Sequence, residues 1–206
     1  MTPSPNPTPA VPARRHRGRR ARAATVLAIG VAIAVPASAS AATDQFLRLG
    51  GDQYAGESLD KEYKGAFELE SSTFNVKRSS ATATAPTFGN LTITKRVDRA
   101  SPALMLAAAS GVQIPSARLS VRQAGSANTA GATYLEYCFQ HVVVMTDQVN
   151  NNSGDDAPLE TVTLSYRQIT QSYTPQSTTG AQETPIVTGW DLVGTPISDF
   201  SSTCGQ

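Results

Sequence analysis

The run from Leu91 to Gly125 constrains the fold of this chain most, because it predicts a strand, a helix and a second strand in succession. Apolar and polar residues alternate from Leu91 to Val97, with the period of two that is typical of a half-buried strand. Only Lys95 interrupts the apolar face of this strand. A second alternation, over residues 118–122, predicts the returning strand.

Between these two strands, the sequence predicts one short helix with chemically marked ends. Ser101 can cap the helix, because its hydroxyl can accept a hydrogen bond from a first-turn amide. Pro102 follows at the first helical position, where the missing N–H has no cost. Residues 103–109 are strong helix formers, and Gly111 can adopt the left-handed conformation that ends a helix.

Further strand patterns, separated by turn signals, cover most of the remaining chain. The predicted strands lie at residues 46–49, 63–74, 134–146, 161–173 and 186–192. Several strands, one helix and no alternation of strands with helices favour a mainly β fold, either a small antiparallel β-barrel or a sandwich.

The longest predicted strand, residues 134–146, carries large apolar side chains along one face. Strict alternation places Phe139 and Val143 on that face together with His141. The opposite face turns apolar at Val142, which predicts a strand that is buried on both faces at this end.

Residues 1–41 have the features of an export signal that follows a disordered, Pro- and Arg-rich start. Six arginines are followed by the uncharged apolar stretch Ala23–Val35, and small residues offer cleavage sites near Ala39 or Ala41. This stretch is shorter than the ~20 apolar residues that span a membrane. We therefore expect cleavage and secretion, by the Sec or the twin-arginine route, rather than an uncleaved anchor.

We expect one domain at residues 42–195, followed by a C-terminal tail at residues 196–206. Eleven of the 17 basic residues and all 16 acidic residues follow the predicted leader, which gives the mature chain a net charge of −5. An acidic chain gains no electrostatic attraction from nucleic acid or anionic lipid. We therefore expect neither as a partner, and no stable membrane insertion after the leader is removed.

The chain has two cysteines, Cys138 in a predicted strand and Cys204 in the tail. Exported proteins seldom keep two free thiols, so we expect a disulfide that pins the tail to the domain. The alternative is a buried thiol in the strand and an unpaired thiol in the tail. Two cysteines and one mature histidine are too few for a metal site, and nothing in the sequence asks for a cofactor.

The sequence offers little for catalysis. His141 is the only histidine of the mature chain, and its apolar strand predicts a core or interface residue rather than a base. Glu68 and Glu70 share a strand face at a spacing that suits acid and base roles, although such pairs are usually a solvated edge. Because a GxSxG turn and a phosphate-binding glycine loop are both lacking, we expect no enzymatic activity and no catalytic residues.

Six segments, in order, resemble the haemolysin-coregulated protein (Hcp) family, whose members form the tube of type VI secretion systems. The segments are GESLDKEY (56–63), LTITKRVDRASPAL (91–104), ARLSVRQAG (117–125), YLEYCFQHVVV (134–144), LETVTLSYRQITQSYTPQ (159–176) and GWDL (189–192). The resemblance implies a small β-barrel with one helix, six subunits that close into a ring, and rings that stack into a tube holding effector proteins. It implies no active site.

By this resemblance, residues 77–89 correspond to a hairpin arm that contacts the neighbouring ring, and a floppy connection without a partner is the alternative. The candidate ring-stacking residues are Lys77, Arg78, Ser79, Ser80, Thr82, Thr84 and Pro86. Deleting Ser79 to Pro86 is expected to weaken ring stacking while the barrel stays folded.

Two other functions stay open at this point. Tube subunits of the family leave the cell through the secretion apparatus itself, so a leader also fits a secreted binding module that reuses the barrel outside any apparatus. A small secreted hydrolase that depends on His141 is the third hypothesis.

Overall fold

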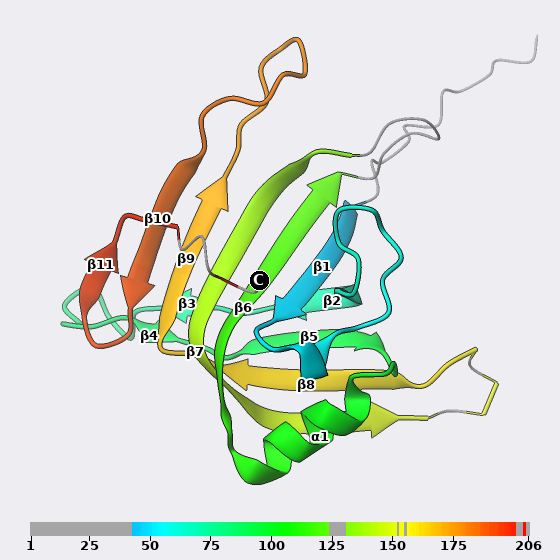
Figure 1. Cartoon of the computed structure of the whole chain (residues 1–206). Helices are drawn as coiled ribbons and strands as arrows, with labels where there is room; N and C mark the ends of the chain where they lie inside the picture. The colour runs from blue at the N-terminus through cyan, green and yellow to red at the C-terminus, as the bar shows by residue number, and fades with distance from the viewer. Residues whose placement is uncertain (1–42, 124–130, 152, 155, 201–203, 205–206) are drawn as a thin grey trace, which may run out of the picture. The chain divides into compact units, whose positions relative to one another are not determined.

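The computed structural model describes residues 43–123, 131–151, 153–154, 156–200 and 204 (Figure 1). The predicted leader, residues 1–41, lies outside the described residues. The elements in chain order are β1 (Thr43–Leu49), η1 (Asp52–Tyr54), β2 (Phe67–Thr73), β3 (Val76–Lys77), β4 (Thr87–Phe88), β5 (Leu91–Arg96), α1 (Ser101–Ser110), β6 (Gln113–Gln123), β7 (Thr133–Asn150), β8 (Leu159–Ser165), β9 (Gln168–Tyr173), β10 (Ile186–Asp191) and β11 (Thr195–Ile197).

Six antiparallel strands close into a barrel, which confirms the predicted mainly β fold with one short helix (Figure 1). Around the barrel the strands follow the order β1, β2, β5, β8, β7 and β6, and β6 pairs with β1 to complete the circle. The first half of β7 also pairs with β9, so β9, β10 and β11 continue the sheet beyond the barrel. Closure removes the strand edges that would otherwise stay open.

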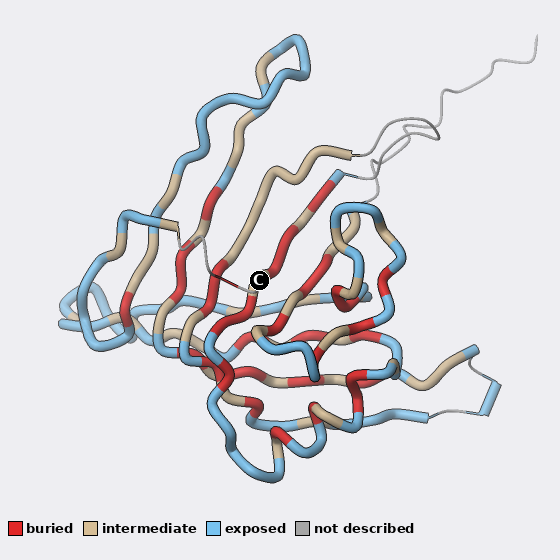
Figure 2. The backbone as a smooth tube through the Cα atoms, in the orientation of Figure 1, coloured by how far each residue is buried: buried red, intermediate tan, exposed pale blue. Residues whose placement is uncertain are grey.

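Buried residues lie along the barrel strands and continue into β9 (Figure 2). The hydrophobic core includes Ile169 of β9, and Trp190 of β10 packs against it. Its largest fully buried apolar side chains are Phe67, Phe139, Leu47, Leu91, Ile93, Leu104, Ile114, Leu119 and Leu164. Phe74 packs edge-on against Tyr137 with ring centroids 5.0 Å apart, which joins the chain before β3 to β7. No helix of the described residues is long and apolar enough to cross a membrane.

The strand β7 changes the face that it buries at His141. This residue has a φ of 55°, and it is the only non-glycine residue with positive φ in the described part of the chain. Phe139 is buried before the bend and Val142 after it, an interval of three residues instead of two. Val143 is only partly buried, so the predicted shared face of Phe139 and Val143 is wrong. The prediction failed because strict alternation assumes an uninterrupted strand.

His141 is exposed in the chain, so the prediction that it is a core residue is wrong. A role at an interface between subunits stays untested. The bend that exposes His141 also lets β7 pair with β9 before it, up to Gln140, and with β8 after it, from Val143.

Other differences lie at the ends of the predicted strands. The predicted strand 63–74 begins only at Phe67, because Gly65 adopts φ 73° and forms a turn in which the Ala66 N–H donates to the Tyr63 carbonyl. The predicted strand 161–173 divides into β8 and β9 around Tyr166. The strand β11, Thr195–Ile197, was not among the predicted strands.

Helix α1 ends as predicted but begins differently. Gly111 adopts the left-handed conformation (φ 65°), and its N–H donates to the Ala107 carbonyl at 2.9 Å. Ser101 is not the N-cap: Ala100 holds that position without a side-chain cap, and Ser101 is the first helical residue. Pro102 is therefore the second helical residue, a position where its missing N–H is still without cost. The Ser101 hydroxyl has other partners, which are described below.

Candidate functional site

The predicted arm, residues 77–89, overlaps a short hairpin formed by β3 and β4, residues 76–88, with an exposed loop. Val76 pairs with Phe88 and Lys77 with Thr87, so the predicted arm has a two-stranded stem. Of the candidate contact residues, Lys77, Arg78, Ser79, Ser80, Thr82 and Thr84 are exposed and Pro86 is partly buried. The loop carries its own contact, since Arg78 Nη1 donates to the Ala83 carbonyl at 2.6 Å.

The base of the arm is tied to the core through Tyr166. The Tyr166 hydroxyl donates to the Gly89 carbonyl at 2.9 Å, and burial raises the pKa of Tyr166 to about 12. The Gly89 N–H in turn donates to the Asn75 carbonyl at 2.9 Å. A Cβ at Gly89 would lie 2.5 Å from Asn75 Oδ1, so a side chain at this position would disturb the base. The arm therefore projects from a fixed base.

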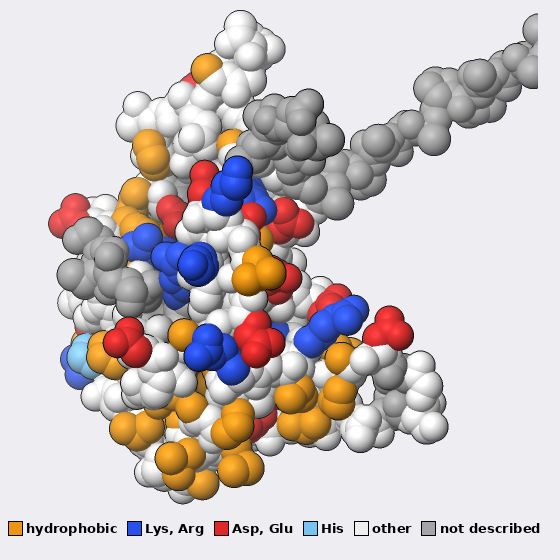
Figure 3. All heavy atoms as spheres, turned by 45° about the vertical axis from the view of Figure 1, so that its right-hand side comes forward, with side chains coloured by type: hydrophobic (Ala, Val, Ile, Leu, Met, Phe, Trp, Pro, Cys, Tyr) orange, Lys and Arg blue, Asp and Glu red, His pale blue; other side chains and the backbone are white. Residues whose placement is uncertain are grey.

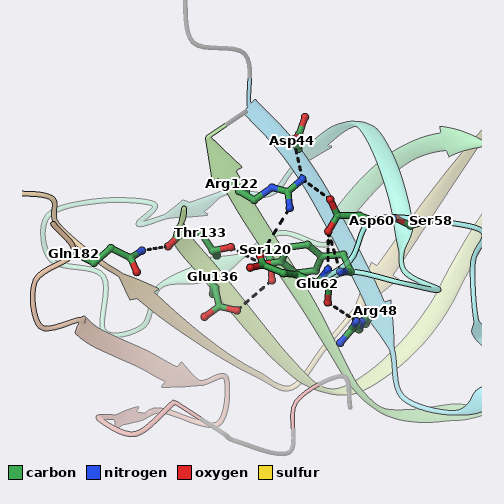
Figure 4. Close-up of polar contacts among 11 residues, drawn as sticks. Asp44, Arg48, Ser58, Asp60, Glu62, Ser120, Arg122, Thr133, Glu136 and Gln182 are labelled. Carbon is green, nitrogen blue, oxygen red and sulfur yellow. Dashed lines mark hydrogen bonds and ion pairs between the residues drawn. The ribbon is translucent and has the colours of Figure 1, made fainter. Parts of the chain in front are cut away.

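A second cluster of polar side chains is centred on Arg122 of β6, on the outer face of the barrel (Figure 4). Arg122 Nη2 lies 2.7 Å from Asp60 Oδ2 and 3.0 Å from Asp44 Oδ2, and Arg122 is only 7% exposed. The hydrogen bond from Arg122 lowers the pKa of Asp60, and the two carboxylates raise the pKa of Arg122. These contacts fix the segment before β2 against β1 and β6.

Aromatic stacking completes this attachment. The rings of Phe46 and Tyr63 stack with centroids 4.3 Å apart and an angle of 6° between their planes. The Arg122 guanidinium carbon lies 4.9 Å from the Phe46 ring centroid, a distance that suits a cation–π contact. The outward-facing Phe46 is buried as a result, although it does not belong to the main core.

A cleft of about 650 Å³ lies beside this cluster. Its charged lining residues are Asp44, Glu57, Asp60, Glu68, Glu70, Asp98, Arg96 and Arg122. Glu68 and Glu70, which were predicted to share a strand face, both line it, and Glu70 forms an exposed ion pair with Arg96 at 3.2 Å. Among the described residues, no group of three or more His, Cys, Asp or Glu side chains is placed to hold a metal ion.

The two cysteines lie together on the polar face of the sheet. The structure joins Cys138 of β7 to Cys204 in a disulfide, and the two residues are 1% and 0% exposed. Upstream in the tail, the Phe200 ring lies 5.5 Å from the Arg118 guanidinium carbon. These contacts place Phe200 and Cys204 against β6 and β7, as the pinned tail requires. The oxidation state of the protein in cells stays a prediction.

A buried network of charges lies at one end of the barrel, and it was not predicted from the sequence. Lys95 of β5 and Glu160 of β8 are cross-strand partners, and both side chains point into the barrel. Lys95 Nζ lies 2.6 Å from Glu160 Oε2 and 2.8 Å from Asp98 Oδ1. The sequence did hold a signal, because alternation places Lys95 on the apolar face, where a charge requires a buried partner.

Ser101 takes part in this network and does not cap the helix. Its hydroxyl donates to Glu160 Oε2 at 2.7 Å and accepts from the Asp98 N–H at 3.0 Å. The Lys95 ammonium also donates to this hydroxyl, at 3.3 Å. With three such partners inside the barrel end, the hydroxyl is not available to the first-turn amides of α1.

Comparison with known proteins identifies the family of this barrel. A sequence model described as "Type VI secretion system effector, Hcp" matches residues 46–173, which is more than half of the chain. The chain belongs to the Hcp family. Protein hcp1 of Pseudomonas aeruginosa is 35% identical over 104 residues, a match that covers 50% of this chain and 63%, less than two thirds, of that relative.

Solved structures support the same assignment. The crystal structure of Hcp1 from Salmonella typhimurium is 32% identical with a TM-score of 0.62, and the match covers 76% of this chain and 99% of that one. The structure of a type six secretion system protein has a TM-score of 0.67 at 26% identity, with 76% and 100% coverage. The Hcp fold is thus present over its whole length, and the remaining quarter of this chain lies outside it.

Proposed function

We propose that this protein is a structural tube subunit of the Hcp family, in which six copies close into a ring and rings stack to carry protein effectors. The main support for this proposal is the family match over the barrel, together with near-complete coverage of a solved Hcp1 chain. The proposed role requires no catalysis, because the subunit acts through its surfaces. The same match favours this role over a secreted binding module or a hydrolase.

Exposed apolar side chains supply a surface for contact between subunits. Met105 and Leu106 of α1 are 64% and 65% exposed, and Val112 after the helix is 46% exposed. Orange apolar side chains gather in the part of the surface that includes α1 (Figure 3). Contiguous exposed apolar surface is typical of interaction sites. We assign this surface to a second copy of the chain, because the family role requires contact between copies.

The arm and the sheet edge supply two further contact surfaces. The strand β11 lies at the end of the sheet order, so its outer side offers unpaired backbone groups within the described sheet. A strand edge of this kind is an aggregation hazard unless another chain covers it. In the proposed assembly, the exposed arm reaches the next ring. The polar face of β6, β7 and β9 is a candidate lining for the ring lumen.

Export by the predicted leader belongs to the same proposal. Its cleavage near Ala39 or Ala41 would leave the barrel intact, since β1 begins at Thr43. A secreted, acidic subunit would then meet its partners outside the cytoplasm. N-terminal sequencing of protein from the culture medium tests this step directly.

The solution mass of the leader-cleaved protein, measured by light scattering on a sizing column, tests the ring. We expect a mass of six subunits, or a multiple of it. We also expect Leu106→Gln to lower the mass, because it places a polar amide in the apolar contact surface. Leu59→Gln is the matched control: Leu59 is 89% exposed and lies in the chain between η1 and β2, outside α1, so its change should leave the mass unaltered. A monomer for the unchanged chain would contradict the proposal.

A further inference from the structure

Two carboxyl groups meet inside the end of the barrel that α1 closes. Asp147 of β7 lies opposite Val162 in the register with β8, and Glu160 lies opposite Val149, so the two residues are diagonal neighbours. Burial, and after it the charge of Glu160 and a hydrogen bond with its side chain, raise the pKa of Asp147. Asp147 Oδ1 and Glu160 Oε1 are both buried without a hydrogen-bond partner among the described residues.

The nearby cation, Lys95, does not supply a partner to the two orphan carboxyl oxygens. Lys95 Nζ already contacts Glu160 Oε2 and Asp98 Oδ1, and it also donates to the Arg96 carbonyl and the Ser101 hydroxyl. Lys95 is therefore directed at the other oxygen of Glu160. With every group ionised, the one lysine and three carboxylates of the cluster would carry a net charge of −2, which favours retention of a proton on the pair.

The other elements packed against Asp147 add no charge. Helix α1 contacts β7 and contains no titratable side chain. The segment of β6 that pairs with β7 nearest this end, Gln113 to Ser116, has none either. On β8, Glu160 is the only charged residue. Helix α1, this segment of β6 and the rest of β8 therefore add no charged group to the carboxyl pair. The charged neighbours are Lys95 of β5 and Asp98, which follows β5.

We propose that Asp147 and Glu160 share one proton, so that the pair is a pH-sensitive latch between β7 and β8. In the protonated state, one carboxyl donates an O–H to the other carboxylate, which gives both orphan oxygens a partner. In the deprotonated state, two buried carboxylates face each other without a donor. Glu160 also accepts from Ser101, so the latch connects this strand pair to the start of α1.

The direction of the pH effect follows from the geometry. Burial, and next the charge of Glu160, raise the pKa of Asp147 from 3.8 to about 6. The folded state therefore binds a proton that the unfolded chain has already released above pH 4. Stability contributed by this proton is lost as the pH rises through about 6, and the barrel end loosens at higher pH.

Thermal unfolding at pH 5 and pH 8 tests the latch, with Asp147→Asn as the main variant. The asparagine amide can donate to Glu160 at any pH and so imitates the protonated form. We expect Asp147→Asn to raise Tm at pH 8, by about 3 °C or more, and to change it little at pH 5. Asp156→Asn, an exposed carboxylate on the loop before β8, is the matched control and should show no such difference between the two pH values.

Two further measurements keep the result decisive. If Asp147→Asn fails to fold, Glu160→Gln replaces it, and its Tm should likewise depend less on pH than that of the unchanged chain. The latch is overturned if the unchanged chain and the variant show parallel Tm values from pH 5 to pH 8. It is also overturned if added calcium chloride stabilises the unchanged chain at pH 8 but not the variant, since the pair would then hold a cation. Light scattering at both pH values, at equal concentration, separates the latch from any change in ring assembly.

Discussion

Lys95 and Glu160 form an ion pair inside the barrel: Nζ and Oε2 are 2.6 Å apart, and the side chains are 1% and 0% exposed. They are direct cross-strand partners on β5 and β8. The Lys95 ammonium also lies 5.0 Å from the Phe67 ring centroid, so its charge is surrounded by two carboxylates, a hydroxyl and an aromatic face. A barrel end that would otherwise be apolar is thus closed by paired charges.

Lys95→Met should destabilise the barrel by about 3–5 kcal/mol, because it leaves Glu160 buried without its counter-charge. The double change Lys95→Met with Glu160→Leu should cost less than the single change, since it removes both charges. Urea unfolding at pH 7 measures both. Lys77→Met on the exposed arm is the control, and its free energy of unfolding should stay within about 0.5 kcal/mol of that of the unchanged chain. A double variant less stable than Lys95→Met alone would contradict the predicted coupling.

Arg122→Gln should lower the free energy of unfolding by about 2 kcal/mol at pH 7, because two carboxylates lose a charged hydrogen-bond donor. The pKa of Asp60 is lowered in the folded state, chiefly by its hydrogen bond from Arg122. This stabilisation is present above the unfolded value of 3.8 and is lost as the pH falls through the lower folded-state pKa. The difference in free energy of unfolding between Arg122→Gln and the unchanged chain should therefore become smaller below pH 4. The exposed Arg99→Gln is the control, and an equal effect from it would refute the special role of Arg122.

Replacing both cysteines, Cys138→Ser with Cys204→Ser, should lower the free energy of unfolding by about 4 kcal/mol, since the disulfide closes a loop with a sequence separation of 66. Reduction of the unchanged protein with dithiothreitol should have the same effect. The double variant, which serves as the control, should not respond to the reductant. Titration of two free thiols in the secreted protein would show instead that the bond does not form.

Replacing Ser79 to Pro86 by Asn-Gly should reduce the stacking of rings and leave the barrel folded. The new turn can still close the β3–β4 hairpin, because Asn-Gly suits tight hairpin turns. Light scattering and electron microscopy should show single rings where the unchanged protein forms stacks, with Tm nearly unaltered. Arg78→Gln, which keeps the loop length, separates the effect of the arm's reach from that of its charge. Stacks of unchanged length would rule out the arm as a stacking contact.

The sequence was sufficient where local chemistry decides the structure. Alternation predicted β5, because this strand runs without interruption and stays in register with β8 from Leu91 to Arg96. Gly111 predicted the end of α1, because few other residues adopt a positive φ at low cost. The ordered segments also predicted the Hcp family, which the match over residues 46–173 then showed.

Only the tertiary structure decided the features that depend on distant partners. The bend at His141 allows β7 to pair with β9 before it and with β8 after it, and no local sequence pattern predicts this bend. Ser101 was predicted to cap a helix, yet its hydroxyl donates to Glu160, which is 59 residues away in the sequence. Lys95 interrupted an apolar face in the sequence, and the closed barrel supplied the buried carboxylates that this charge requires. Local propensity acts over a few residues, whereas desolvation of a charge depends on everything that the fold brings around it.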